Sequence, residues 1–156
     1  MSGFGKLCLI SAISLLFAST IPAEAATAPS DPCSLLRAGD VNTATGGGTY
    51  LTPESKAAPK PYASSGPGTD CHYKAGESSL LFRIYFDSST DVATGLFNEL
   101  KMFFPPVSSP SGLGDDAYFD KHNGLHVRKG NVRLFLNGTP TNAQLQAMAT
   151  LVAGKL

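Results

Sequence analysis

The chain has 156 residues, a formal net charge of zero and 15% charged residues against 42% hydrophobic ones. The charges stand singly along the chain, so we expect no charged surface that would bind nucleic acid or an anionic membrane. The hydrophobic fraction is ordinary for a globular protein. It excludes a disordered chain and allows a core of reasonable size.

Residues 1–25 have the pattern of a cleavable export signal. Lys6 supplies the positive start, an uncharged apolar run extends from Leu7 to Ile21, and Ala23-Glu24-Ala25 has the spacing of a cleavage site. The run is shorter than the about 20 apolar residues that span a bilayer, and an N-terminal membrane anchor is the alternative. We predict a mature protein that begins at Ala26 and is secreted or periplasmic, with no stable membrane anchor after cleavage.

The three cysteines indicate in which redox compartment the protein resides. Cys8 is lost with the signal, and neither Cys8 nor Cys33 follows the small-residue box that lipid attachment requires. Cys33 and Cys71 then form an even pair in an oxidising compartment, which predicts one disulfide, with two free thiols as the alternative. The pair lacks the C-x-x-C spacing of a redox site, so we expect a structural bond.

A single domain is predicted at 31–156, after a flexible arm at 26–30. Asp31 and Pro32 are typical of a helix start, and a second short turn follows from Asp40. Residues 52–70 contain four prolines and form a long loop, which is either functional or mobile and cannot be a central strand.

Strands are expected at 71–75 and 80–87, because apolar residues alternate there. In the second strand Arg83 and Asp87 point away from the apolar face. A helix follows, capped by Ser88, with an apolar stripe at 92–104. It ends at Pro105-Pro106.

For the last third of the chain, the sequence predicts a loop at 105–114 and a three-strand meander at 117–120, 125–128 and 132–136. A final helix starts at Thr141, with Gln144 completing a capping box. The fold class is therefore α+β: an antiparallel sheet with helices packed on one face, in the order α-β-β-α-β-β-β-α, with one disulfide.

The segment 31–36 (Asp-Pro-Cys-Ser-Leu-Leu), the mid-chain Cys71 and the segment 112–118 (Gly-Leu-Gly-Asp-Asp-Ala-Tyr) resemble a family of short exported bacterial proteins. Many of its members are actinobacterial lipoproteins of unknown function. The resemblance covers most of the mature chain and implies that the two cysteines form the disulfide. This chain lacks the lipid-attachment cysteine of the family. The family has no established catalytic residues, so none is carried over.

Three short motifs suggest cofactor or metal binding, but each lacks the neighbouring structure or ligands that such a site needs. Residues 112–117 match G-x-G-x-x-A, but a loop precedes them and a strand follows, where a dinucleotide site needs a strand and then a helix. Asp115-Asp116 lack further oxygen ligands at a fixed spacing. His122 is expected at the tip of a hairpin turn and His126 on the strand after it, so the two histidines do not converge. We predict no cofactor and no metal.

The hairpin at 120–125 decides which side chains share a face. With Gly124 in the left-handed position, Lys121 pairs with Leu125, and Asp120 faces His126 on the outer side. Arg128 and Arg133 then oppose each other across Gly130-Asn131, a like-charge pair that needs an acid nearby. The outer face would carry six candidate binding residues: Tyr118, Asp120, His126, Arg128, Arg133 and Phe135. The alternative is a plain solvated face.

Aromatic, arginine and histidine side chains are typical of a binding surface. We therefore expect a non-enzymatic binding module for a protein or small-molecule ligand, acting through this face or the 52–70 loop. The alternative is an extracytoplasmic hydrolase that uses Asp120 and His126 as acid and base. The sequence contains no motif that assigns a catalytic residue.

Overall fold

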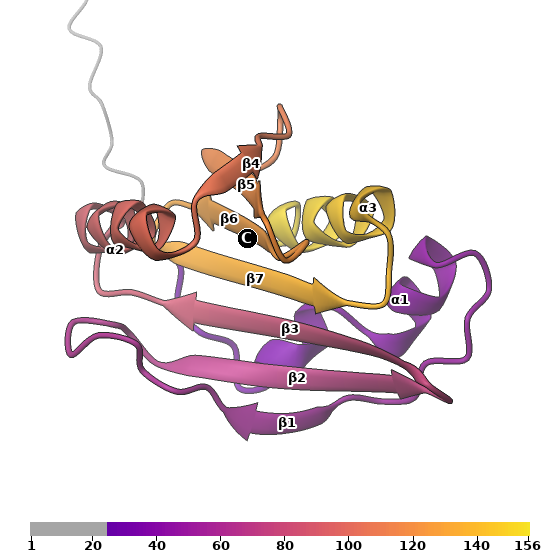
Figure 1. Ribbon diagram of the computed structural model, residues 1–156. Coiled ribbons are helices and arrows are strands. Elements are labelled where there is room, and N and C mark those ends of the chain that lie inside the picture. The colour runs from indigo at the N-terminus through magenta and orange to yellow at the C-terminus, as the bar shows by residue number, and fades with distance from the viewer. Residues whose placement is uncertain (1–24) are drawn as a thin grey trace, which may run out of the picture.

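The computed structural model describes residues 25–156, so the predicted export signal lies outside the described residues except for Ala25. Seven strands form one antiparallel sheet in the order β1-β2-β3-β7-β6-β5-β4 (Figure 1). The strands are β1 (Glu54–Ala57), β2 (Gly68–Ala75), β3 (Ser78–Phe86), β4 (Pro106–Ser108), β5 (Asp116–Asp120), β6 (Leu125–Lys129) and β7 (Val132–Gly138). The helical segments are the 3-10 turn η1 (Pro32–Leu35) and the α-helices α1 (Ala38–Ala44), α2 (Thr90–Phe103) and α3 (Asn142–Ala153).

The α+β class, the antiparallel sheet and the approximate element order are confirmed. Two short strands, β1 and β4, were not predicted. They occupy the two edges of the sheet, where a proline-rich segment can pair on one side only. The 52–70 segment therefore contains the edge strand β1, and its last residues, from Gly68 on, begin β2, which pairs with a strand on each side. The expectation that this segment contributes to no central strand is wrong for these residues, which follow the last proline of the segment.

One face of the sheet carries the main core. Phe82 and Ile84 of β3 and Leu136 of β7 are fully buried there against Leu145 and Met148 of α3. Burying an apolar side chain of this size stabilises a fold by about 1.5–3 kcal/mol. This layer, which η1 and α1 complete, is the main source of stability.

The helices begin where the sequence supplies caps. Thr141 and Gln144 form the predicted capping box of α3. Helix α2 begins one residue later than predicted, because Ser89 and not Ser88 accepts the backbone N–H of Val92, at 3.2 Å. Each side chain satisfies a backbone donor that the first helical turn leaves free.

Helix α2 differs from the expectation that the helices share one face. Its Phe97 packs edge-on against Tyr118 of β5, with 5.4 Å between ring centroids. Tyr118 points away from the main core, to which its neighbour Phe119 belongs. Helix α2 therefore lies on the opposite face, because the outer sides of β5, β6 and β7 carry aromatic rings that its apolar stripe can bury.

The predicted disulfide joins Cys33 and Cys71, whose Cα atoms are 5.6 Å apart. Both residues are buried in the main core. The bond connects η1 to β2, and α1, the proline-rich segment and the edge strand β1 lie within the loop that it closes. It therefore anchors the end of the proline-rich segment at Cys71.

The β5–β6 hairpin has a different register from the predicted one. Phe119 pairs with Leu125, not with Val127, and Asn123 rather than Gly124 is in the left-handed region, with φ of 59°. The turn still has three residues but lies one residue earlier than expected, at 121–123, because the backbone N–H of Asp120 donates to the carbonyl oxygen of Gly124. Side chains alternate with a period of two, so a shift of two residues leaves each one on its predicted face.

We expect the double variant Cys33→Ala/Cys71→Ala to lose about 2–5 kcal/mol of unfolding free energy, because the unfolded chain regains the freedom of the open loop. Urea unfolding of the variant and of the oxidised wild type measures this difference. Unchanged midpoints would show that the bond contributes nothing to the fold.

Candidate functional site

The six candidate binding residues share one face of the sheet, the face that α2 covers. Four of them are buried, and two are partly buried. The alternative prediction, a plain solvated face, is therefore wrong. Buried are Tyr118, Asp120, His126 and Arg133; partly buried are Arg128 and Phe135.

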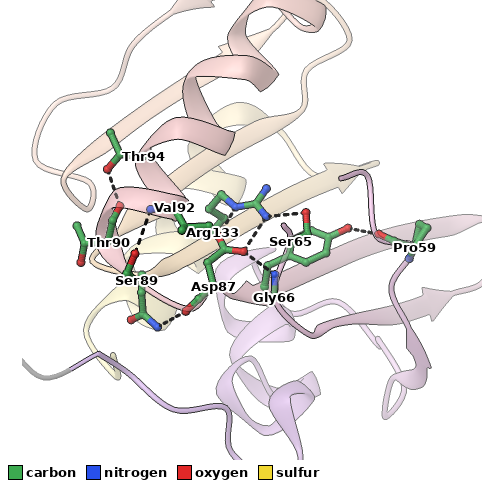
Figure 2. A network of polar contacts seen from close by, with 11 residues as sticks. Pro59, Ser65, Gly66, Asp87, Ser89, Thr90, Val92, Thr94 and Arg133 are labelled. Atoms are coloured by element: carbon green, nitrogen blue, oxygen red, sulfur yellow. Dashed lines mark hydrogen bonds and ion pairs between the residues drawn. The ribbon is translucent and has the colours of Figure 1, made fainter. Parts of the chain in front are cut away.

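A buried ion pair lies at the centre of this face (Figure 2). Arg133 donates through Nε to Asp87 Oδ2 at 2.5 Å and through Nη2 to Oδ1 at 3.1 Å, and its guanidinium lies 4.7 Å from the ring centroid of Tyr85. The backbone N–H of Gly66 also donates to Asp87, at 2.9 Å, and Ser65 Oγ accepts a longer bond from Arg133 Nη2. The pair thus ties the β1–β2 loop to the end of β3 and to β7.

One nitrogen of this guanidinium has no partner. Arg133 Nη1 is buried and makes no hydrogen bond to any described residue. In Figure 2 this nitrogen points away from Asp87, and no dashed line reaches it. Because buried polar groups are nearly always hydrogen-bonded, the free donor is a feature to be explained.

The two opposed arginines occur as predicted. Arg128 pairs with Arg133 across β6 and β7, and Arg128 Nη1 donates to Asp115 at 2.9 Å. Asp116 accepts from Lys101 at 2.6 Å. Each arginine is therefore paired with a carboxylate, Arg133 with Asp87 and Arg128 with Asp115. The adjacent Asp115 and Asp116 both form ion pairs. Within residues 25–156, no three His, Cys, Asp or Glu side chains are grouped so that they could hold a metal ion.

Asp120 and His126 contact each other, although in the observed register His126 is paired with Tyr118 and Asp120 lies diagonally across from it on the neighbouring strand. Asp120 Oδ2 lies 3.0 Å from His126 Nε2, and Oδ1 accepts the backbone N–H groups of His122 and Gly124 at 2.8 and 2.9 Å. Burial alone would raise the pKa of Asp120, but these hydrogen bonds outweigh it and lower the pKa. The carboxylate is thus an acceptor that holds the β5–β6 turn.

His126 lies among aromatic rings. It stacks on Tyr118 at 4.6 Å and on Phe104 at 5.8 Å, and Phe135 is 4.8 Å away. Burial lowers the pKa of His126, and the hydrogen bond to Asp120 offsets this only in part. The neutral ring donates through Nε2 to Asp120, which leaves Nδ1 as an acceptor.

A cleft of about 230 Å³ opens beside these side chains. It lies between the last turn of α2, the outer face of β3, β7 and β6, and the β1–β2 loop. Of the hollows in the described chain, those beside the disulfide (about 470 Å³) and near Tyr50 (about 350 Å³) contain no buried polar side chain. The cleft is lined by Pro61, Arg83, Tyr85, Leu100, Phe104, His126, Arg133 and Phe135.

Three of the six candidates line this cleft: His126, Arg133 and Phe135. The other three do not. Tyr85 and Phe104 also line the cleft and were not predicted from the sequence. The alternation along β3 could have indicated Tyr85, because it shares a face with the outward Arg83. No local pattern could have indicated Phe104, whose position depends on where α2 packs.

No protein-family model, curated protein or solved structure matches this chain. The resemblance to short exported bacterial proteins therefore stays a prediction. Within the described part of the chain, no helix is long and apolar enough to cross a membrane. The disulfide is typical of proteins from oxidising compartments.

We expect Asp87→Asn to lose about 3–5 kcal/mol of unfolding free energy, because Arg133 would keep a buried charge without its partner. The matched control is Asp91→Asn in the first, exposed turn of α2, where only about 0.3–1 kcal/mol of helix-dipole interaction is lost. Urea unfolding of both variants measures the difference. Equal losses would contradict a central role of the ion pair.

We expect His126→Gln to weaken the pH dependence of stability. Because the pKa of His126 is lowered in the folded state, the unfolded chain binds the proton first as pH falls below about 6.5, so stability drops by at most about 1.4 kcal/mol per pH unit. Glutamine keeps a donor to Asp120 but does not titrate.

Urea unfolding at intervals between pH 7 and pH 5 measures this slope. The control His122→Gln changes an exposed turn residue and should retain the wild-type slope. An identical slope for His126→Gln and wild type would mean that this histidine does not contribute.

Proposed function

We propose that this protein is an exported, non-enzymatic binding module, secreted or periplasmic. We propose further that its cleft takes a small, flat, mostly apolar ligand with one hydrogen-bond acceptor. The observation that carries the proposal is the unpartnered Nη1 of Arg133, a buried donor on a side chain that lines the cleft. A buried donor without a partner costs about 1–3 kcal/mol, and a ligand oxygen could recover part of this.

The walls of the cleft favour an aromatic ring. Phe104 is 41% exposed, and Phe135 is partly buried, so both leave apolar surface that a ligand can cover. His126 contacts both of these rings and is also stacked against Tyr118. Offset and edge-to-face contacts between rings add about 0.5–1.5 kcal/mol beyond the burial of area.

The charges favour a neutral ligand. Arg133 is paired with Asp87, and Arg83 is held by Asp70 through two bonds of 2.6 and 2.7 Å. The arginines are thus compensated, and His126 is neutral. A carboxylate ligand would add a further negative charge beside arginines that Asp87 and Asp70 already neutralise, whereas a carbonyl oxygen needs only the free N–H.

The size of the cleft limits the ligand to about one ring. Its volume of about 230 Å³ lies below the roughly 300–1,000 Å³ of pockets that hold drug-sized molecules. A single substituted ring is therefore a better fit than a nucleotide, a cofactor or an oligosaccharide.

The hydrolase alternative rests on the contact between Asp120 and His126. Two features favour binding over catalysis. Both oxygens of Asp120 are engaged by His126 and the turn amides, and no Ser, Thr or Cys is among the described residues that line the cleft. A general base with no nucleophile to activate lacks half of the required pair.

The test compares acetophenone, ethylbenzene and benzoate as ligands of the exported, oxidised protein, followed by NMR chemical shifts. Acetophenone has the carbonyl acceptor, ethylbenzene lacks it, and benzoate adds a charge. We expect acetophenone to bind about fivefold more tightly than ethylbenzene, which corresponds to about 1 kcal/mol for one hydrogen bond. Benzoate should bind more weakly than acetophenone.

The matched variants are Phe104→Ala and Phe103→Ala. Phe104 lines the cleft, whereas the neighbouring and more exposed Phe103 does not. Phe104→Ala should weaken acetophenone binding about three- to tenfold through the lost ring contact, and Phe103→Ala should leave it unchanged. Absence of saturable shifts for all three probes, or equal effects of the two variants, would overturn the proposal.

A further inference from the structure

The start of the described chain is held by one buried side chain. The backbone N–H of Ala26 donates to Asn131 Oδ1 at 2.8 Å, and Asn131 Nδ2 donates back to the carbonyl oxygen of Ala26 at 2.8 Å. Asn131 is 3% exposed, and Ala26 packs partly against the main core. The preceding Ala25 is exposed. The contact therefore begins at Ala26.

The orientation of the Asn131 amide is determined by its surroundings. Nδ2 also donates to the carbonyl oxygen of Asp87 at 2.9 Å, and the backbone N–H of Asp87 donates to the carbonyl oxygen of Asn131 at 2.9 Å. A flipped amide would direct Oδ1 at two carbonyl oxygens. The amide oxygen is thus held as an acceptor aimed at the nitrogen of Ala26.

Ala26 is also the residue at which the sequence predicts the mature chain to begin, after Ala23-Glu24-Ala25. We propose that Asn131 forms a docking site for the new N-terminus that export processing creates. The step is hydrolysis of the Ala25–Ala26 peptide bond by an extracytoplasmic peptidase. Water adds across the bond, Ala25 becomes a carboxylate, and Ala26 becomes an α-ammonium group.

The site suits an ammonium better than the amide of an uncleaved chain. One N–H of the ammonium keeps the bond to Asn131 Oδ1, and this bond becomes charge-assisted and therefore stronger. The other two N–H groups point toward the position of the exposed Ala25, so water can solvate them. The charge is thus not buried, and docking carries no large desolvation cost.

The docking site rests on the proposed export of the protein but not on the ligand proposed for the cleft, because Asn131 does not line the cleft. It also gives the 26–30 arm a fixed point at its first residue.

The first test is the position of the processed end. The full 156-residue chain is expressed in a bacterial host, recovered from outside the cytoplasm, and analysed by intact mass and N-terminal sequencing. We expect the recovered protein to begin at Ala26. A mature chain that begins elsewhere, or that retains residues 1–25, would overturn the proposal.

The second test is the reactivity of the new amino group. An amine-reactive ester near neutral pH labels an α-amine, of pKa about 8, ahead of lysines at about 10.4. Wild type should be labelled at Ala26 about fivefold more slowly than Asn131→Ala, the effect of one hydrogen bond. The control Asn98→Ala removes an exposed asparagine of α2 and should match wild type.

Equal labelling rates in folded wild type and folded Asn131→Ala would overturn the docking site. If Asn131→Ala is not recovered as a folded protein, the decision comes from wild type alone. Its N-terminus should then be labelled about fivefold more slowly when folded than in urea, and equal rates would reject the site.

Discussion

The buried pair of Arg133 and Asp87 is the constraint around which the outer face of the sheet is organised. Burying two charges is unfavourable unless each is paired and its remaining atoms are hydrogen-bonded. The backbone N–H of Gly66 and the ring of Tyr85 supply much of that environment. Their positions follow from this requirement, so the β1–β2 loop is held against the sheet. The polar floor of the cleft is thereby set before any ligand arrives.

The two faces of the sheet have different physical tasks. The face covered by α1 and α3 is almost entirely apolar and supplies most of the stability through burial. The face covered by α2 mixes aromatic rings with ion pairs and a neutral histidine, and α2 does not cover it completely. A buried donor without a partner and uncovered ring surface therefore occur beside the cleft, where binding is proposed.

Two connections hold distant parts of the chain to these layers. The disulfide fixes η1 to β2, and Asn131 holds Ala26 beside the β6–β7 turn. Asn131 also bonds to the backbone of Asp87, whose carboxylate receives Arg133. Ala26, the end of β3 and the Arg133–Asp87 ion pair thus belong to one hydrogen-bonded network, although they are far apart in sequence.

Features that depend on neighbours along the chain could be predicted from the sequence alone. The disulfide partners, the capping box at Thr141, the face of each strand residue and the opposition of Arg128 and Arg133 all follow from cysteine number, local hydrogen bonding or the period of two. Only the tertiary structure decided that α2 covers the outer face and that Arg133 is neutralised by Asp87. The reason is that burial and charge pairing depend on which distant segments come into contact, and no local sequence pattern specifies those contacts.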